Sequence, residues 1–124
     1  MPRRSWSDKL ADSLRGIRTG IRGESNFVVH LAMAAAVVLV AAWLQVSRAE
    51  WCLLVMCIAA VLAAEYFNTS LERLAREVDR NRNPNIGAAL DMASAGVLIA
   101  AIGAAIVGCV VFGHRAGVLL EWWN

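Results

Sequence analysis

The sequence predicts an all-α integral membrane protein, with an N-terminal amphipathic surface helix followed by three transmembrane helices. Of the 124 residues, 59% are hydrophobic and only 18% are charged, which leaves too little polar surface to cover a soluble domain of this size. Three apolar runs, at about residues 27–46, 51–74 and 86–112, each reach the length of about 20 residues that a membrane-crossing helix needs. We therefore expect residues 1–124 to form a single membrane-embedded domain.

The segment before the first run, about residues 5–22, has the pattern of a helix that lies on a membrane surface. Its apolar residues recur at steps of three and four, while basic residues occupy the other faces. The apolar set is Trp6, Leu10, Leu14, Ile17 and Ile21. The basic residues could hold anionic lipid or the phosphates of a nucleotide, and the pattern leaves both interpretations open. The N-terminus lacks the apolar stretch of a secretory signal, so we expect the first span to direct insertion.

The basic residues are distributed unevenly along the chain, and this distribution predicts the topology. Ten of the twelve either precede the first span or lie between the second and third: Arg3, Arg4, Lys9, Arg15, Arg18, Arg22, Arg73, Arg76, Arg80 and Arg82. By the positive-inside rule, the N-terminus and the second connection are cytoplasmic. Tryptophans gather at the opposite ends of the spans, as interfacial anchors do: Trp43, Trp51, Trp122 and Trp123. We expect a multi-pass membrane protein with a cytoplasmic N-terminus.

The three spans differ in their polar and small residues. The first contains His30, which the pattern favours as a packing residue over a ligand. It is joined to the second by the short connection VSRAE, which predicts an antiparallel hairpin, and Pro84 and Gly87 mark the break before the third. The third carries Gly96, Ala100, Ala104 and Gly108 at four-residue spacing, a smooth strip that favours close helix packing within or between chains. The three cysteines all lie in spans, where packing is their expected role.

The second span carries the most informative residues, because Glu65, Asn68 and Glu72 follow one another at i, i+3 and i+7 on one helix face. Ionisable side chains inside hydrocarbon are expensive and mark functional sites by default. At about 1.5 Å per residue, Glu65 lies inside the cytoplasmic half of the membrane and Glu72 at its boundary. Glu24 before the first span and Asp91 at the start of the third reach the same layer.

Clustered carboxylates at a water boundary suit a divalent cation with oxygen ligands such as Mg²⁺, and a carboxylate in apolar surroundings suits general base catalysis. Proton-coupled transport uses the same groups, although the outer half of the bundle offers no polar pathway. Glu24 and Glu72 taken singly also fit a solvated rim of charged helix ends. The sequence contains no P-loop, dinucleotide fingerprint, serine-protease arrangement or zinc motif.

Three segments resemble the small prokaryotic diacylglycerol kinases and undecaprenol kinases. GIRTGIRGESNFVVHL is similar to the entry to that family's first span, AEYFNTSLERL resembles its signature E-x-x-N-[ST]-x-x-E, and ALDMASAGVLIAA resembles its A-K-D-x-x-x-x-A-V-L stretch. The resemblance covers roughly residues 10–105. It implies a homotrimeric lipid kinase that transfers the γ-phosphate of ATP, with Mg²⁺, to the hydroxyl of diacylglycerol or undecaprenol at the cytoplasmic surface.

The resemblance also implies roles for individual residues. Glu65 would be the catalytic base near the lipid hydroxyl, with Asn68 orienting groups beside it. Glu24 and Glu72 would hold Mg²⁺ with the nucleotide, and Asp91 would support the nucleotide site. Arg15, Arg18 and Arg22 would bind its phosphates. We expect a lipid substrate and the membrane as partners, and no nucleic acid.

The chain departs from the family pattern at three positions. Leu90 stands where the family usually has the lysine before the motif aspartate, Arg76 where an acidic residue often follows the motif glutamate, and Val28 where a basic residue often follows the phenylalanine. Loss of a cation that neutralises phosphate lowers phosphoryl-transfer rates by orders of magnitude unless another group replaces it. The surface-helix arginines or Arg76 could do so. The alternative is a silent or weakly active member that serves as a nucleotide-binding membrane scaffold.

Overall fold

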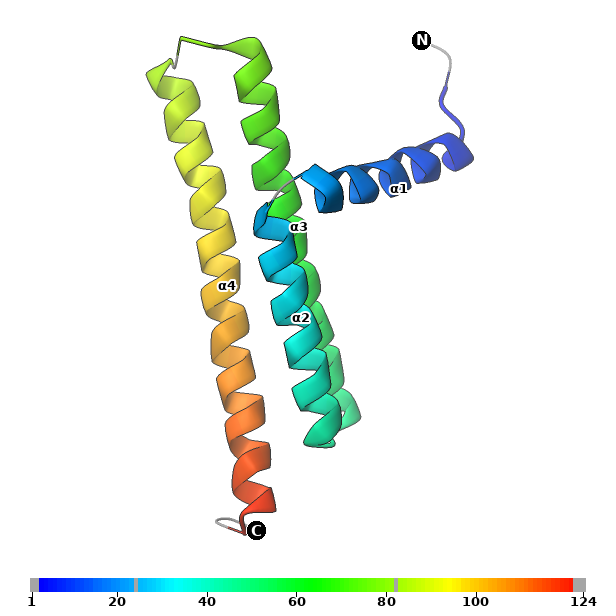
Figure 1. Cartoon of the computed structure of the whole chain (residues 1–124), viewed down its shortest axis with the longest axis vertical. Coiled ribbons are helices and arrows are strands. Elements are labelled where there is room, and N and C mark those ends of the chain that lie inside the picture. The colour runs from blue at the N-terminus through cyan, green and yellow to red at the C-terminus, as the bar shows by residue number, and fades with distance from the viewer. Residues whose placement is uncertain (1–2, 24, 82, 122–124) are drawn as a thin grey trace.

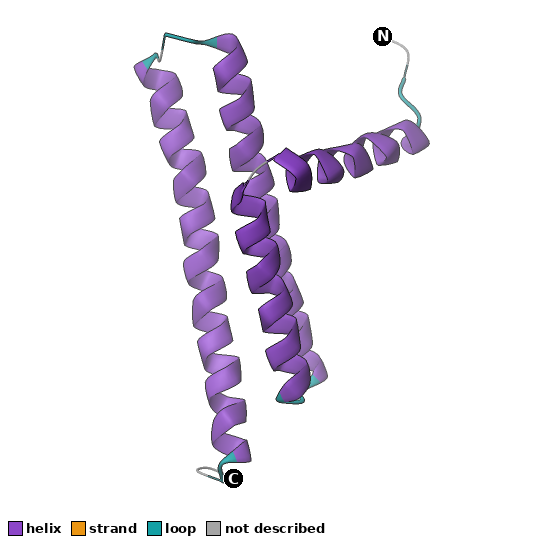
Figure 2. Cartoon of the chain, viewed as in Figure 1, coloured by secondary structure: helices purple, strands orange, loops and turns teal. Residues whose placement is uncertain are grey.

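All secondary structure that the computed structural model describes is helical (Figure 1, Figure 2), and the described residues are 3–23, 25–81 and 83–121. Four helices follow one another: α1 (Trp6–Gly23), α2 (Ser25–Trp43), α3 (Arg48–Val78) and α4 (Pro84–Leu119). The last three are each long and apolar enough to cross a membrane. The predicted fold class, an N-terminal helix ahead of three membrane-spanning helices, is confirmed.

Helices α2, α3 and α4 run along the long axis of the molecule, whereas α1 projects sideways from them (Figure 1). Helix α3 packs against both α2 and α4, so it is the element that the others share. Because α2 and α3 are joined by only four residues, they form the antiparallel hairpin that the sequence predicts. The site residues on α3 consequently have neighbours from two other helices.

Helix α1 begins with a reciprocal cap and ends against α3. The hydroxyl of Ser5 accepts a hydrogen bond from the backbone N–H of Asp8 at 3.2 Å, and the Asp8 carboxylate accepts one from the Ser5 hydroxyl at 2.6 Å and one from the Ser5 N–H at 3.2 Å. These bonds hold the pKa of Asp8 below its ordinary value of 3.8. The apolar face of α1 is exposed, from 85% at Trp6 to 42% at Ile21. That face is therefore available to lipid, as an amphipathic surface helix requires.

Two adjoining caps form the turn between α2 and α3. Gln45 adopts φ 51°, and the bonds from Gln45 N to Ala42 O and from Val46 N to Ala41 O close the C-terminus of α2 in a Schellman motif. Ser47 then caps α3 through a capping box with Glu50. The turn thus leaves few unsatisfied backbone groups at this end of the membrane.

The hairpin is fixed to α4 near this turn. A buried apolar cluster joins the three helices and consists of Ala41, Leu44, Val46, Leu54 and Val111. Beside it, Nε of Arg115 donates to Oε2 of Glu50 at 2.8 Å, with both side chains largely buried. An ion pair between α3 and α4 therefore reinforces the end of the bundle opposite Glu72.

The connection between α3 and α4 is ordered by short polar side chains. The Asp79 carboxylate accepts hydrogen bonds from the backbone N–H groups of Asn81 at 3.0 Å and Asn83 at 2.6 Å. Asn83 caps α4 by accepting from Asn85 N at 2.9 Å, and Pro84 occupies the first turn. The predicted break at Pro84 is confirmed, and α3 continues to Val78, beyond its apolar part.

At Gly96 and Gly108, the small-residue strip of α4 is not in close contact with another helix of the described chain. A Cβ atom added at Gly96 or Gly108 would meet nothing within 4 Å. The alternative that the strip serves packing between chains therefore stays a prediction.

Candidate functional site

Glu65 is a buried carboxylate in the membrane-spanning part of α3. Only 3% of the residue is exposed, although its position on an apolar helix would permit it to face lipid. Its Oε2 lies 3.6 Å from Nε2 of His30 on α2, while its Oε1 is buried and has no hydrogen-bond partner among the residues that the structure describes. A buried carboxyl oxygen without a partner is costly, and such atoms are often the ones that meet a ligand. Glu65 thus points inward and has one carboxyl oxygen that is not engaged by the described residues.

Asn68 and Glu72 continue this face of α3 toward the connection with α4. Nδ2 of Asn68 donates to Oε1 of Glu72 at 3.0 Å, an i, i+4 contact that fixes the orientation of both side chains. The Oδ1 atom of Asn68 is buried and has no hydrogen-bond partner within the described ranges. Buried acceptors therefore recur at Glu65 and Asn68, about one helical turn apart.

A groove between the end of α3 and the start of α4 brings Glu72 and Asp91 together. Its volume is about 690 Å³. It is lined on α3 by Glu72, Ala75, Arg76, Asp79 and Arg80, and on α4 by Ile86, Gly87, Leu90, Asp91 and Ser94. Carboxylates and guanidinium groups alternate along the α3 wall, so the groove can hold a cation and an anion next to each other. The expectation that Glu72 and Asp91 share one layer agrees with this arrangement.

The three arginines predicted for the nucleotide site do not line this groove in the single chain. Arg15, Arg18 and Arg22 are exposed on α1, and Arg15 forms an ion pair with Asp12. Glu24 lies outside the described residues. The preceding Gly23 is in direct contact with the guanidinium of Arg73, whose neighbour in the chain is Glu72. The end of α1 is therefore close to the polar face of α3.

The sequence matches a known family over most of its length. The family model described as prokaryotic diacylglycerol kinase matches residues 11–112. The chain belongs to the prokaryotic diacylglycerol kinase family. It is 31% identical over 98 residues to the undecaprenol kinase of Bacillus subtilis (strain 168), covering 79% of this chain and 80% of that relative. It is 30% identical over 105 residues to the diacylglycerol kinase of Escherichia coli (strain K12), covering 85% and 86% respectively. As a member of this family the chain is a membrane lipid kinase.

Sequence reasoning missed one anchor of this kinase's site, Tyr66. The Tyr66 hydroxyl donates to the Ile17 carbonyl of α1 at 2.7 Å, and its ring packs on Phe27 with centroids 4.3 Å apart. The ring also lies directly against Gly20, the buried residue of α1. A signal was present, because Tyr66 is the only tyrosine of the chain and follows Glu65, and because Gly20 and Gly23 lie one turn apart on α1.

Proposed function

We propose that this lipid kinase uses ATP with Mg²⁺ to phosphorylate the hydroxyl of diacylglycerol or undecaprenol at the cytoplasmic face of the bacterial inner membrane. The observation that carries the proposal is the unpaired, buried Oε1 of Glu65, which lies one turn before the Asn68–Glu72 pair and the groove that contains Asp91. An acceptor inside the membrane and a charged groove at its edge match a reaction between a lipid hydroxyl and a water-soluble phosphate donor.

Glu65 acts as the base in this proposal. As the lipid oxygen bonds to the γ-phosphorus, its proton passes to Oε1 of Glu65; the bond from that phosphorus to the bridging oxygen breaks, and ADP leaves with the electron pair. The proton is later released to water, so that lipid alcohol and ATP give lipid phosphate, ADP and a proton. Glu72 is seven residues from Glu65, roughly 10 Å along the helix axis, which leaves room for the reacting phosphoryl group between them.

The acidic residues fit Mg²⁺ bound together with a nucleotide. Among the described residues no group of three His, Cys, Asp or Glu side chains is arranged to hold a metal alone. Mg²⁺ typically takes one or two carboxylates, with phosphate oxygens and water completing its octahedron. Glu72, already oriented by Asn68, supplies one such carboxylate, and Glu24 is proposed to supply the other. When bound, the ion would neutralise charge on the transferring phosphoryl group.

Arg76 is proposed to supply the positive charge that Leu90 cannot. Leu90 and Arg76 line the same groove as Glu72 and Asp91, whereas the α1 arginines do not. An Arg presents a planar set of donors that matches phosphate oxygens. Because α1 ends close to α3, a homotrimer could still bring Arg15, Arg18 or Arg22 of one chain to the groove of another.

The direct test is transfer of labelled phosphate from ATP to each lipid by purified protein in mixed micelles. With Mg²⁺, label should appear in diacylglycerol or in undecaprenol, and chelation of the metal should abolish it. Glu65→Gln should abolish turnover while leaving nucleotide affinity nearly intact. Absence of label in both lipids, for the native chain and for Leu90→Lys, would refute the proposal. Calorimetric binding of MgATP without turnover would then identify a nucleotide-binding scaffold.

A further inference from the structure

His30 is the residue of α2 that meets the buried carboxylate of α3. Its Nε2 is 3.6 Å from Oε2 of Glu65, and the side chains are 20% and 4% exposed respectively. The contact joins residues from two separate helices, so it depends on how α2 and α3 pack. The separation is within ion-pair range and slightly longer than a hydrogen bond. Catalytic hydrogen bonds are often long before substrate binds and shorten in the productive complex.

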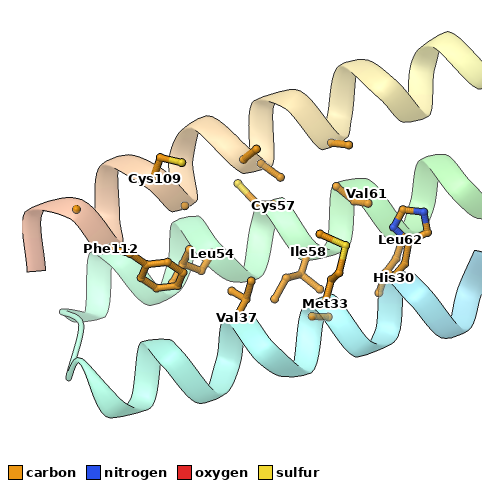
Figure 3. Close-up of a pocket in the computed structure, with 16 residues that line it drawn as sticks. His30, Met33, Val37, Leu54, Cys57, Ile58, Val61, Leu62, Cys109 and Phe112 are labelled. Carbon is orange, nitrogen blue, oxygen red and sulfur yellow. The ribbon is translucent and has the colours of Figure 1, made fainter. Parts of the chain in front are cut away.

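His30 also closes one end of a second, apolar groove. This groove has a volume of about 530 Å³, lies between α2, α3 and α4, and extends from His30 to Phe112 (Figure 3). In Figure 3 Met33 and Val37 follow His30 along α2. Every other lining residue is Ala, Gly, Val, Leu, Ile, Met, Phe or Cys. A role in packing alone does not explain why His30 lies next to Glu65, the most buried carboxylate of α3.

We infer that His30 is a positioning residue for Glu65. Its Nε2–H directs Oε2 and so fixes the carboxylate with Oε1, the unpaired oxygen, directed at the lipid hydroxyl. This inference rests on the proposed role of Glu65 as the base. A carboxylate with one oxygen held and the other available has a defined orientation, and orientation errors of about 1 Å lower rates by about 10²-fold. Without His30, Glu65 retains its chemistry and loses its fixed geometry.

The kinetic test compares substitutions that keep or remove the donor. We expect His30→Leu to lower kcat by about 10- to 100-fold while leaving KM for MgATP unchanged, because the nucleotide groove is on another part of α3. His30→Gln retains an N–H donor and should recover most of this loss. Met33→Leu, one turn further along α2 in the same apolar groove, is the matched control and should leave kcat unchanged.

A spectroscopic test does not depend on turnover. The chain has two histidines, and His114 near the end of α4 provides an internal reference for ¹⁵N-labelled imidazole signals. Glu65→Gln should shift the Nε2 signal of His30 and leave that of His114 in place. An unchanged His30 signal would refute the contact.

The outcomes separate this inference from the proposed function. A native chain that labels no lipid overturns both. An active native chain, an inactive Glu65→Gln variant and undiminished kcat in His30→Leu would overturn the positioning role alone. Equal losses in His30→Gln and His30→Leu would also overturn it, since the donor would then be irrelevant.

Discussion

The hydroxyl of Tyr66 on α3 donates a hydrogen bond to the backbone carbonyl of Ile17 on α1 at 2.7 Å. The same ring packs on Phe27 at the start of α2, so one side chain of α3 contacts two other helices. Tyr66 directly follows Glu65. The surface helix is therefore attached to the bundle at the level of the proposed catalytic base, and its position relative to the site depends on this contact.

Removing the hydroxyl while keeping the ring should loosen α1 without dissociating it. We expect Tyr66→Phe to weaken the packing of α1 on the bundle by about 1 kcal/mol, the usual net contribution of one hydrogen bond. The helix should stay in place because the ring still contacts Phe27. Amide hydrogen exchange should become faster in α1 and stay unchanged in α4. Equal exchange in α1 of both proteins would show that the hydrogen bond does not hold the helix.

Gly20 should tolerate no side chain. A Cβ atom there would collide with the ring of Tyr66, so we expect Gly20→Ala to displace α1 and reduce lipid phosphorylation at least severalfold. Gly16→Ala is the matched control, since a Cβ at Gly16 meets nothing within 4 Å and alanine is favoured over glycine by about 1 kcal/mol in a helix interior. The kinase assay and the helix content of both variants test this. Equal activity in the two variants would contradict the close contact.

The Glu50–Arg115 pair should stabilise the end of the bundle opposite the proposed site. Arg115→Gln removes a charged donor from a largely buried carboxylate, and we expect a loss of about 1–2 kcal/mol in the free energy of unfolding in micelles. Arg48 is exposed in the first turn of α3, the helix that carries Glu50, and Arg48→Gln should change stability little. Because the pair is remote from Glu72, the Arg115→Gln molecules that remain folded should have the same kcat as the native chain.

The proposal that Arg76 supplies the positive charge missing at Leu90 can be tested by paired substitutions. Arg76→Gln should reduce kcat/KM for ATP by about 10²-fold, and Leu90→Lys introduced into that variant should restore part of the loss. Arg80→Gln, one turn further along the groove, should have a smaller effect. If Arg76→Gln is fully active, the phosphate is neutralised elsewhere, and the α1 arginines become the next candidates.

The cap of α1 should titrate at acidic pH. Hydrogen bonds from Ser5 hold the pKa of Asp8 below 3.8 in the folded chain, so the cap contributes fully above pH 3.8 and is lost as pH falls through the lowered value. We expect Ser5→Ala to raise the pKa of Asp8 toward 3.8, as followed by carboxyl chemical shifts. Ser13→Ala, whose hydroxyl bonds to the Lys9 carbonyl instead, should leave the pKa of Asp8 unchanged.

The helices, the membrane spans and the family could all be predicted from the sequence. These depend on local quantities: run length against hydrocarbon thickness, a 3.6-residue apolar period in α1, and the spacing of Glu65, Asn68 and Glu72 along one helix. The break at Pro84 followed from the same local pattern. The family signature around Glu65 was readable because its members lie within eight consecutive residues.

Which side chains meet one another follows from how the helices pack. A helix that is apolar on every side carries no signal for its rotation or its neighbour, so nothing local predicted the contacts His30–Glu65, Tyr66–Ile17 or Glu50–Arg115. The rotation of α3 between α2 and α4 turned Glu65 inward and aligned Glu72 with Asp91 across one groove. Packing between helices set these relationships, because each joins residues far apart in the chain.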